Sequence, residues 1–82
     1  MVDRTGAHYE LARALIRFED GDVEAALRGA RSAAQAVRGA GRLEARVHTL
    51  VTALEREAAG SGPPTSVARA YRDAVDELRH AD

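Results

Sequence analysis

The chain has no cysteine, no tryptophan and no lysine, and it carries only two prolines and three aromatic residues. Without cysteine, the protein can form neither a disulfide nor a thiolate metal site, and it has no thiol nucleophile. The sequence also lacks the Gly-Lys-Ser/Thr phosphate loop, the Gly-x-Gly-x-x-Gly dinucleotide motif and the Gly-x-Ser-x-Gly nucleophile motif. Because no catalytic signature is present, we expect a protein that is not an enzyme and uses no cofactor.

Long apolar runs are missing as well. No stretch approaches the roughly 18 apolar residues of a membrane span, and the first residues lack the apolar core of a signal peptide. The formal charge of −1 gives no strong field for nucleic acid or for an anionic membrane. We therefore expect a cytoplasmic protein that binds neither nucleic acid nor membrane.

Alanine is abundant, with 18 of the 82 residues. Alanine favours the helix intrinsically, but each alanine side chain buries little apolar area. A chain of this length buries only roughly 60% of its unfolded surface. The sequence therefore predicts closely packed helices around a thin core, with a modest stability that self-association would increase.

Apolar residues recur with the helical period of 3.6 along the whole chain, and no alternating strand pattern occurs. This periodicity predicts one all-α domain over residues 1–82, built from four amphipathic antiparallel helices arranged as two αα-hairpins. We expect the helices near residues 5–19, 22–38, 42–59 and 66–80. The expected core stripes are Leu11, Ala12, Leu15 and Phe18; Val23, Ala26, Leu27, Ala30, Ala34 and Val37; Leu43, Val47, Leu50, Val51, Leu54 and Ala58; and Val67, Ala70, Tyr71, Ala74, Val75 and Leu78.

Short polar joints separate the expected helices. Gly21 can adopt a positive φ, and the carboxylate of Asp22 can cap the helix that follows it. At the start of the first helix, Asp3 or Thr5 can take the same capping role. Gly29 lies in the middle of an expected helix at a cost of about 1 kcal/mol relative to alanine, and the sequence leaves open whether it permits a close helix crossing or is simply tolerated.

The spacing of small residues around the first joint is similar to that of a known repeat. The two joints at Gly21 and Gly62 are 41 residues apart, and the residues that carry the resemblance are Ala14, Gly21, Asp22, Ala26 and Ala33. The chain resembles the tetratricopeptide repeat superfamily, particularly its longer-period members in bacterial transcriptional regulators. It departs from that family in its period, which exceeds the usual ~34 residues, and in lacking the Trp-Leu-Gly signature.

The resemblance implies a protein-binding scaffold in which the first helix of each repeat lines a concave groove. The outward faces of residues 5–19 and 42–59 would then form one groove, whose residues would be Glu10, Arg13, Arg17, Arg46, Thr49, Ala53 and Arg56. Arginines in such a groove suit the carboxylates of an acidic peptide or of a chain terminus. The predicted function is a non-enzymatic adaptor that binds a partner protein or acidic peptide. Two repeats are fewer than a solenoid needs, so we also expect a homodimer.

Two other interpretations stay open from the sequence. One is a closed, self-assembling four-helix bundle with a structural role, in which all four apolar stripes point inward. The other is a small arginine-lined all-α enzyme, which needs a deep pocket with at least two convergent arginines and a carboxylate.

Histidines near carboxylates can indicate a metal site, and a stripe of arginines can indicate a phosphate-binding surface. His48 follows Glu44 by four residues, and His80 follows Glu77 by three, but these carboxylates fall off the apolar stripes. We therefore expect surface pairs and no metal site. A basic stripe without interleaved aromatic residues is typical of a solvated face, and its members are Arg28, Arg31, Arg38 and Arg42.

Overall fold

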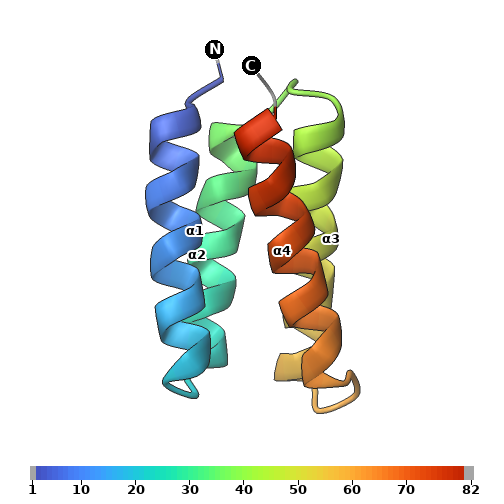
Figure 1. The fold of residues 1–82 in the computed structure, drawn as a ribbon. Coiled ribbons are helices and arrows are strands. Elements are labelled where there is room, and N and C mark those ends of the chain that lie inside the picture. The colour runs from blue at the N-terminus through green and yellow to red at the C-terminus, as the bar shows by residue number, and fades with distance from the viewer. Residues whose placement is uncertain (1, 81–82) are drawn as a thin grey trace.

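The computed structural model describes residues 2–80, and within this range it contains four helices and no strand. The helices are α1 (Arg4–Glu19), α2 (Val23–Ala36), α3 (Arg42–Ala58) and α4 (Pro64–His80). They run alternately down and up, so that consecutive helices are antiparallel (Figure 1). The predicted all-α domain of four antiparallel helices is confirmed.

Local sequence determines where the helices begin. The Asp3 carboxylate accepts a hydrogen bond of 2.8 Å from the Gly6 amide, and the Asp22 carboxylate accepts one of 3.1 Å from the Ala25 amide. Each carboxylate satisfies an amide that has no partner within its own helix. Gly21 has φ 85°, which a residue with a Cβ atom rarely adopts. The predicted capping by Asp22 is confirmed, and Asp3 rather than Thr5 caps α1.

Two boundaries differ from the expected ones. Helix α4 begins at Pro64 rather than near residue 66, because proline is well tolerated at the first helical position, where an amide would have no partner. Helix α2 ends at Ala36 rather than near residue 38. Val37 has already left helical geometry there, and Gly39 follows with a positive φ.

The four helices are arranged in a ring. Each helix packs against the next one in the chain, and α1 also meets α4, with the smallest contact of the four pairs. Helices α1 and α3 have no close backbone approach because they occupy diagonally opposite corners of the ring. Among the described residues, this order of neighbours is that of an up-down-up-down four-helix bundle.

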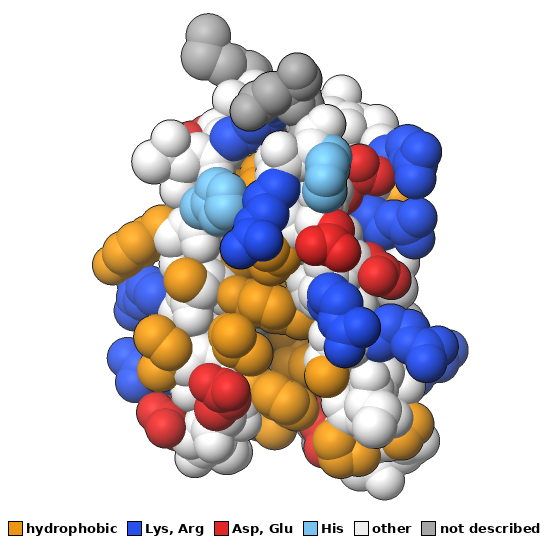
Figure 2. All heavy atoms as spheres, in the orientation of Figure 1, with side chains coloured by type: hydrophobic (Ala, Val, Ile, Leu, Met, Phe, Trp, Pro, Cys, Tyr) orange, Lys and Arg blue, Asp and Glu red, His pale blue; other side chains and the backbone are white. Residues whose placement is uncertain are grey.

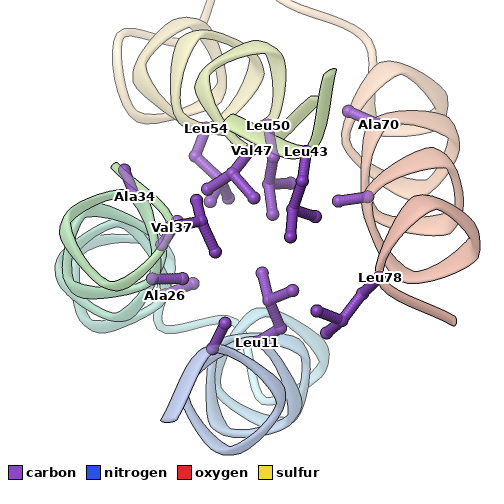
Figure 3. Packing of buried hydrophobic residues seen from close by; sticks show 14 of the residues in the cluster. Leu11, Ala26, Ala34, Val37, Leu43, Val47, Leu50, Leu54, Ala70 and Leu78 are labelled. Carbon is purple, nitrogen blue, oxygen red and sulfur yellow. The ribbon is translucent and has the colours of Figure 1, made fainter. Parts of the chain in front are cut away.

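One core lies inside the ring, and buried side chains from all four helices point into it (Figure 3). Its largest fully buried members are Leu11, Val37, Leu43, Val47, Leu50 and Leu54. Helix α2 contributes mainly alanines, which are Ala26, Ala30, Ala33 and Ala34. Because these alanine side chains are small, the leucines of α3 supply most of the side-chain volume at the centre of the core.

Two expected core residues are exposed. Ala12 lies on the outer side of α1, since α1 turns Ala7, Leu11 and Ala14 inward instead. Ala58 is the last residue of α3 and is exposed at the end of that helix. Among the described residues, no helix combines the length and the apolar character that crossing a membrane demands.

Candidate functional site

Helices α1 and α2 approach closely at a pair of small residues. A Cβ atom placed on Gly29 would lie 3.3 Å from the Cβ atom of Ala14 and 3.4 Å from the carbonyl oxygen of Glu10. Both distances are tighter than most Cβ contacts, so the absence of a side chain at position 29 lets the backbones come together. Of the two roles that the sequence left open for Gly29, the structure shows the close helix crossing.

A groove of about 320 Å³ lies above this crossing. Its small residues are Ala14, Ala25, Gly29 and Ser32, and its longer side chains are Glu10, Arg13, Arg17 and Arg28. We call this set the arginine groove. Because small residues line its middle, the long side chains of both helices border a shallow channel rather than filling it.

The arginine groove has an excess of positive charge. Among the described residues, no carboxylate forms an ion pair with Arg13, Arg17 or Arg28. Elsewhere arginines do form such pairs between helices, since Arg31 lies 3.0 Å from a Glu55 oxygen, and Arg42 pairs in the same way. Glu10 supplies the one carboxylate that lines the groove. Three guanidinium groups are therefore available to an anionic ligand.

Arg13 is held by an aromatic neighbour. Its guanidinium carbon lies 5.5 Å from the centroid of the Tyr9 ring, which is within the range of a cation–π interaction. This contact leaves the N–H groups of the guanidinium able to donate to a ligand.

The structure separates the predicted site residues into two sets. Glu10, Arg13 and Arg17 lie together in the arginine groove, where α2 adds Arg28 and Ser32. The other three predicted residues belong to α3 and lie elsewhere, namely Arg46, Thr49 and Arg56. The single groove expected from the faces of α1 and α3 is therefore wrong, because those helices are diagonal in the ring.

The α3 residues line two other surfaces. Thr49, Ala53 and Arg56 border a groove of about 590 Å³ between α3 and α4, together with Arg69 and Asp73. Two hydroxyls of this lining already donate within the chain, that of Thr49 to the Ala45 carbonyl oxygen and that of Ser61 to the Arg56 carbonyl oxygen. Arg46 lies instead with acidic residues of α4, which are Asp73, Asp76 and Glu77. The first of these surfaces has a smaller excess of positive charge than the arginine groove, and the second has an excess of negative charge. Arg46 and Thr49 also line a smaller hollow with Arg42, whose guanidinium already pairs with Glu77.

Arg28 and Ser32 were not predicted as groove residues. The sequence pattern placed Arg28 in a solvated stripe, although it directly precedes Gly29. The glycine marks the point of closest approach, so the polar residues beside it were a usable signal for the α2 side of the groove.

An apolar hollow lies on the other side of α1, where α1 meets α4. It encloses about 130 Å³, and its large apolar residues, which we call the α1–α4 seam, are Leu15, Phe18, Leu50, Leu54, Val67 and Tyr71. Figure 2 shows hydrophobic side chains around a depression between α1 and α4. The Tyr71 hydroxyl donates to the carbonyl oxygen of Leu11 and so links α4 to α1.

The histidines do not assemble a metal centre. Within residues 2–80, no group of three or more potential metal ligands comes together. His48 Nε2 lies 3.8 Å from a Glu44 oxygen, and His80 Nδ1 lies 2.7 Å from the Asp76 carbonyl oxygen. Both histidines are thus exposed residues that contact their own helix.

Comparison with known proteins finds no family model, no curated protein and no solved structure that matches the chain. The resemblance to the tetratricopeptide repeat superfamily therefore stays a prediction, and the functional argument depends on the surfaces described above.

The titration of Tyr71 tests the contact between α1 and α4. Burial and, to a smaller extent, the negative charge of the nearby Glu19 carboxylate together raise the pKa of Tyr71 from 10.0 to about 12. The unfolded chain would lose this proton at lower pH than the folded protein. The stabilisation by Tyr71 is therefore fully present below pH 10.0 and is lost as the pH rises through about 12.

Ultraviolet absorbance of tyrosinate in a Tyr9→Phe variant measures this titration, because Tyr71 is then the one tyrosine of the chain. We expect a higher midpoint in buffer than in denaturing urea. Equal midpoints in the two solutions would contradict the buried position of the hydroxyl.

Proposed function

We propose that this protein is a non-enzymatic helical module that binds an acidic segment of a partner protein in the arginine groove. The observation that carries the proposal is the set of three guanidinium groups, from Arg13, Arg17 and Arg28, beside a channel of alanine and glycine. Each guanidinium offers a planar fork of donors that fits a carboxylate with two parallel hydrogen bonds.

The groove holds the arginines and the carboxylate that an arginine-lined enzyme needs, but these arginines are exposed rather than enclosed in a deep pocket, which supports binding rather than catalysis. A nucleophilic mechanism needs a hydroxyl or thiol beside a base that is itself oriented by a third group. The lining contains one hydroxyl, from Ser32, and one carboxylate, from Glu10, and no hydrogen bond joins them. A shallow, solvent-open channel also does little to exclude water from a reaction.

The exposure of the groove arginines predicts that the affinity for an acidic segment depends on salt. The arginines are exposed, so their attraction for carboxylates is weakened by salt over a Debye length of about 10 Å at 0.1 M ionic strength. Affinity for an acidic segment should therefore fall as salt is added.

Reversing two charges of the groove tests the proposal. The variant Arg13→Glu with Arg17→Glu should bind a labelled Asp- and Glu-rich peptide at least about tenfold more weakly, since two carboxylate contacts become repulsive. Fluorescence anisotropy at low ionic strength measures the affinity, and circular dichroism checks that the helices are retained.

The matched control is Arg38→Glu with Arg79→Glu, which changes the net charge equally at exposed arginines outside the groove. The control should bind the peptide nearly as well as the unaltered chain. An equal loss in both double variants would show that only net charge matters, and the assignment of the groove would be wrong.

A second candidate function is self-assembly through the α1–α4 seam. The observation that favours it is the hollow between the two helices that share the smallest contact in the ring, where Leu15, Phe18 and Tyr71 are only half buried. In this alternative a second copy covers these residues, and the bundle serves as a structural unit.

Sedimentation equilibrium tests the self-assembly. A dimer should appear as the concentration rises into the high micromolar range, and Leu15→Gln should weaken it by removing apolar area from the interface. Ile16→Gln is the control, because Ile16 lies on the same helix but outside the seam. A monomer at every concentration would eliminate this second function.

A further inference from the structure

The outward side of α1 carries an unusual apolar strip. Tyr9 is 60% exposed and Ile16 is 55% exposed, and they are the large hydrophobic residues found exposed within residues 2–80. They are seven residues apart, which is close to two turns, so they lie on the same face of the helix. Exposed Ala12 lies between them. We call Tyr9, Ala12 and Ile16 the outer strip.

The outer strip borders the arginine groove. The Arg13 guanidinium lies over the Tyr9 ring, and Arg17 directly follows Ile16 in the chain. A single exposed hydrophobic residue needs no explanation, but here both lie on one face of the helix that also supplies two of the unpaired arginines. A ligand that covers the strip therefore also reaches positive charge along one edge.

The charges around the outer strip indicate whether a second copy of the chain or a different protein would bind there. In a two-fold dimer through the strip, Arg13 lies near the middle of α1 and would face the same residue of the second copy. Like charges brought together in this way oppose association. The acidic residues of α1 and its C-cap are Glu10, which lines the arginine groove, and Glu19 and Asp20, at the end of the helix. The charge pattern thus favours an acidic partner over a second copy.

We propose that the occupant is an acidic amphipathic helix of a partner protein. Its apolar side lies on Tyr9, Ala12 and Ile16, and the carboxylates along one of its edges bind Arg13, Arg17 and Arg28. This inference rests on the proposed function, and it adds the class of the acidic segment. Recognition of a helix through apolar anchors about one and two turns apart is a recurrent mode of peptide binding.

Three synthetic peptides distinguish recognition of a helix from simple charge attraction. Each has about 18 residues, a length that gives about five helical turns. The first is amphipathic, with leucines on one side and glutamates along the flanks. The second has the same composition in scrambled order, and the third is amphipathic with glutamine in place of glutamate. Each is titrated into the full chain, with fluorescence anisotropy for affinity and circular dichroism for helix formation.

The amphipathic acidic peptide should bind at least about tenfold more tightly than the scrambled peptide and should gain helix on binding. The variant Tyr9→Ser with Ile16→Ser should remove this advantage, so that this variant binds the amphipathic and the scrambled acidic peptides with equal affinity. Because both residues are exposed, the fold should tolerate the changes. Ala45→Ser with Ala58→Ser, at exposed positions of α3, is the control and should keep the advantage.

Equal binding of the amphipathic and scrambled peptides would overturn the inference but leave the proposed function standing, provided that Arg13→Glu with Arg17→Glu still weakens both. If neither acidic peptide binds, both proposals fail. Tight binding of the glutamine peptide would show that charge has no part in recognition, and the inference would again be wrong. A dimer of the chain alone that Tyr9→Ser with Ile16→Ser abolishes would assign the strip to a second copy instead.

Discussion

The contact between Ala14 and Gly29 is the constraint on which the rest of the structure depends. It lets α1 and α2 form the most extensive of the helix pairs, although α2 offers mainly alanines to the core. The leucines of α3 then fill the centre of the ring (Figure 3). The same contact leaves only small residues along the middle of the outer surface, so the long arginines border an open channel. One close approach thus supports the core and shapes the candidate site.

The two sides of α1 differ in physical character, and the candidate functions follow from this difference. Toward α2, the approach is tight and the surface above it is positively charged. Toward α4, the contact is looser, the side chains are larger, and a hydrogen bond from Tyr71 joins the helices. Between these sides lies the exposed strip of Tyr9 and Ile16. A single helix therefore contributes to the arginine groove, the outer strip and the seam.

Sequence patterns predicted the elements better than their arrangement. The helical period and the capping by Asp22 could be predicted because each is a local property, whereas the role of Gly29 stayed open because it depends on a second helix. Which helices lie side by side could not be predicted. Two antiparallel hairpins with the same apolar stripes can either stack on each other or close into a ring. This is why Arg56 was grouped with Arg13 although their helices are diagonal. Alanine also made the apolar stripe of α1 hard to define. Because alanine is found both in cores and on surfaces, the sequence could not show whether Ala12 or Ala14 is buried.

The most direct test is the free energy of unfolding in urea of Gly29→Val, compared with that of Ser32→Val one turn away on the same helix. Both variants place valine in α2, but a Cβ atom at position 29 would lie 3.4 Å from the α1 backbone, whereas Ser32 is exposed. The account predicts that Gly29→Val loses about 1–3 kcal/mol through overpacking, although leaving glycine favours the helix. It predicts a much smaller change for Ser32→Val. A Gly29→Val protein as stable as the unaltered chain, or more stable, would contradict the close approach of α1 and α2.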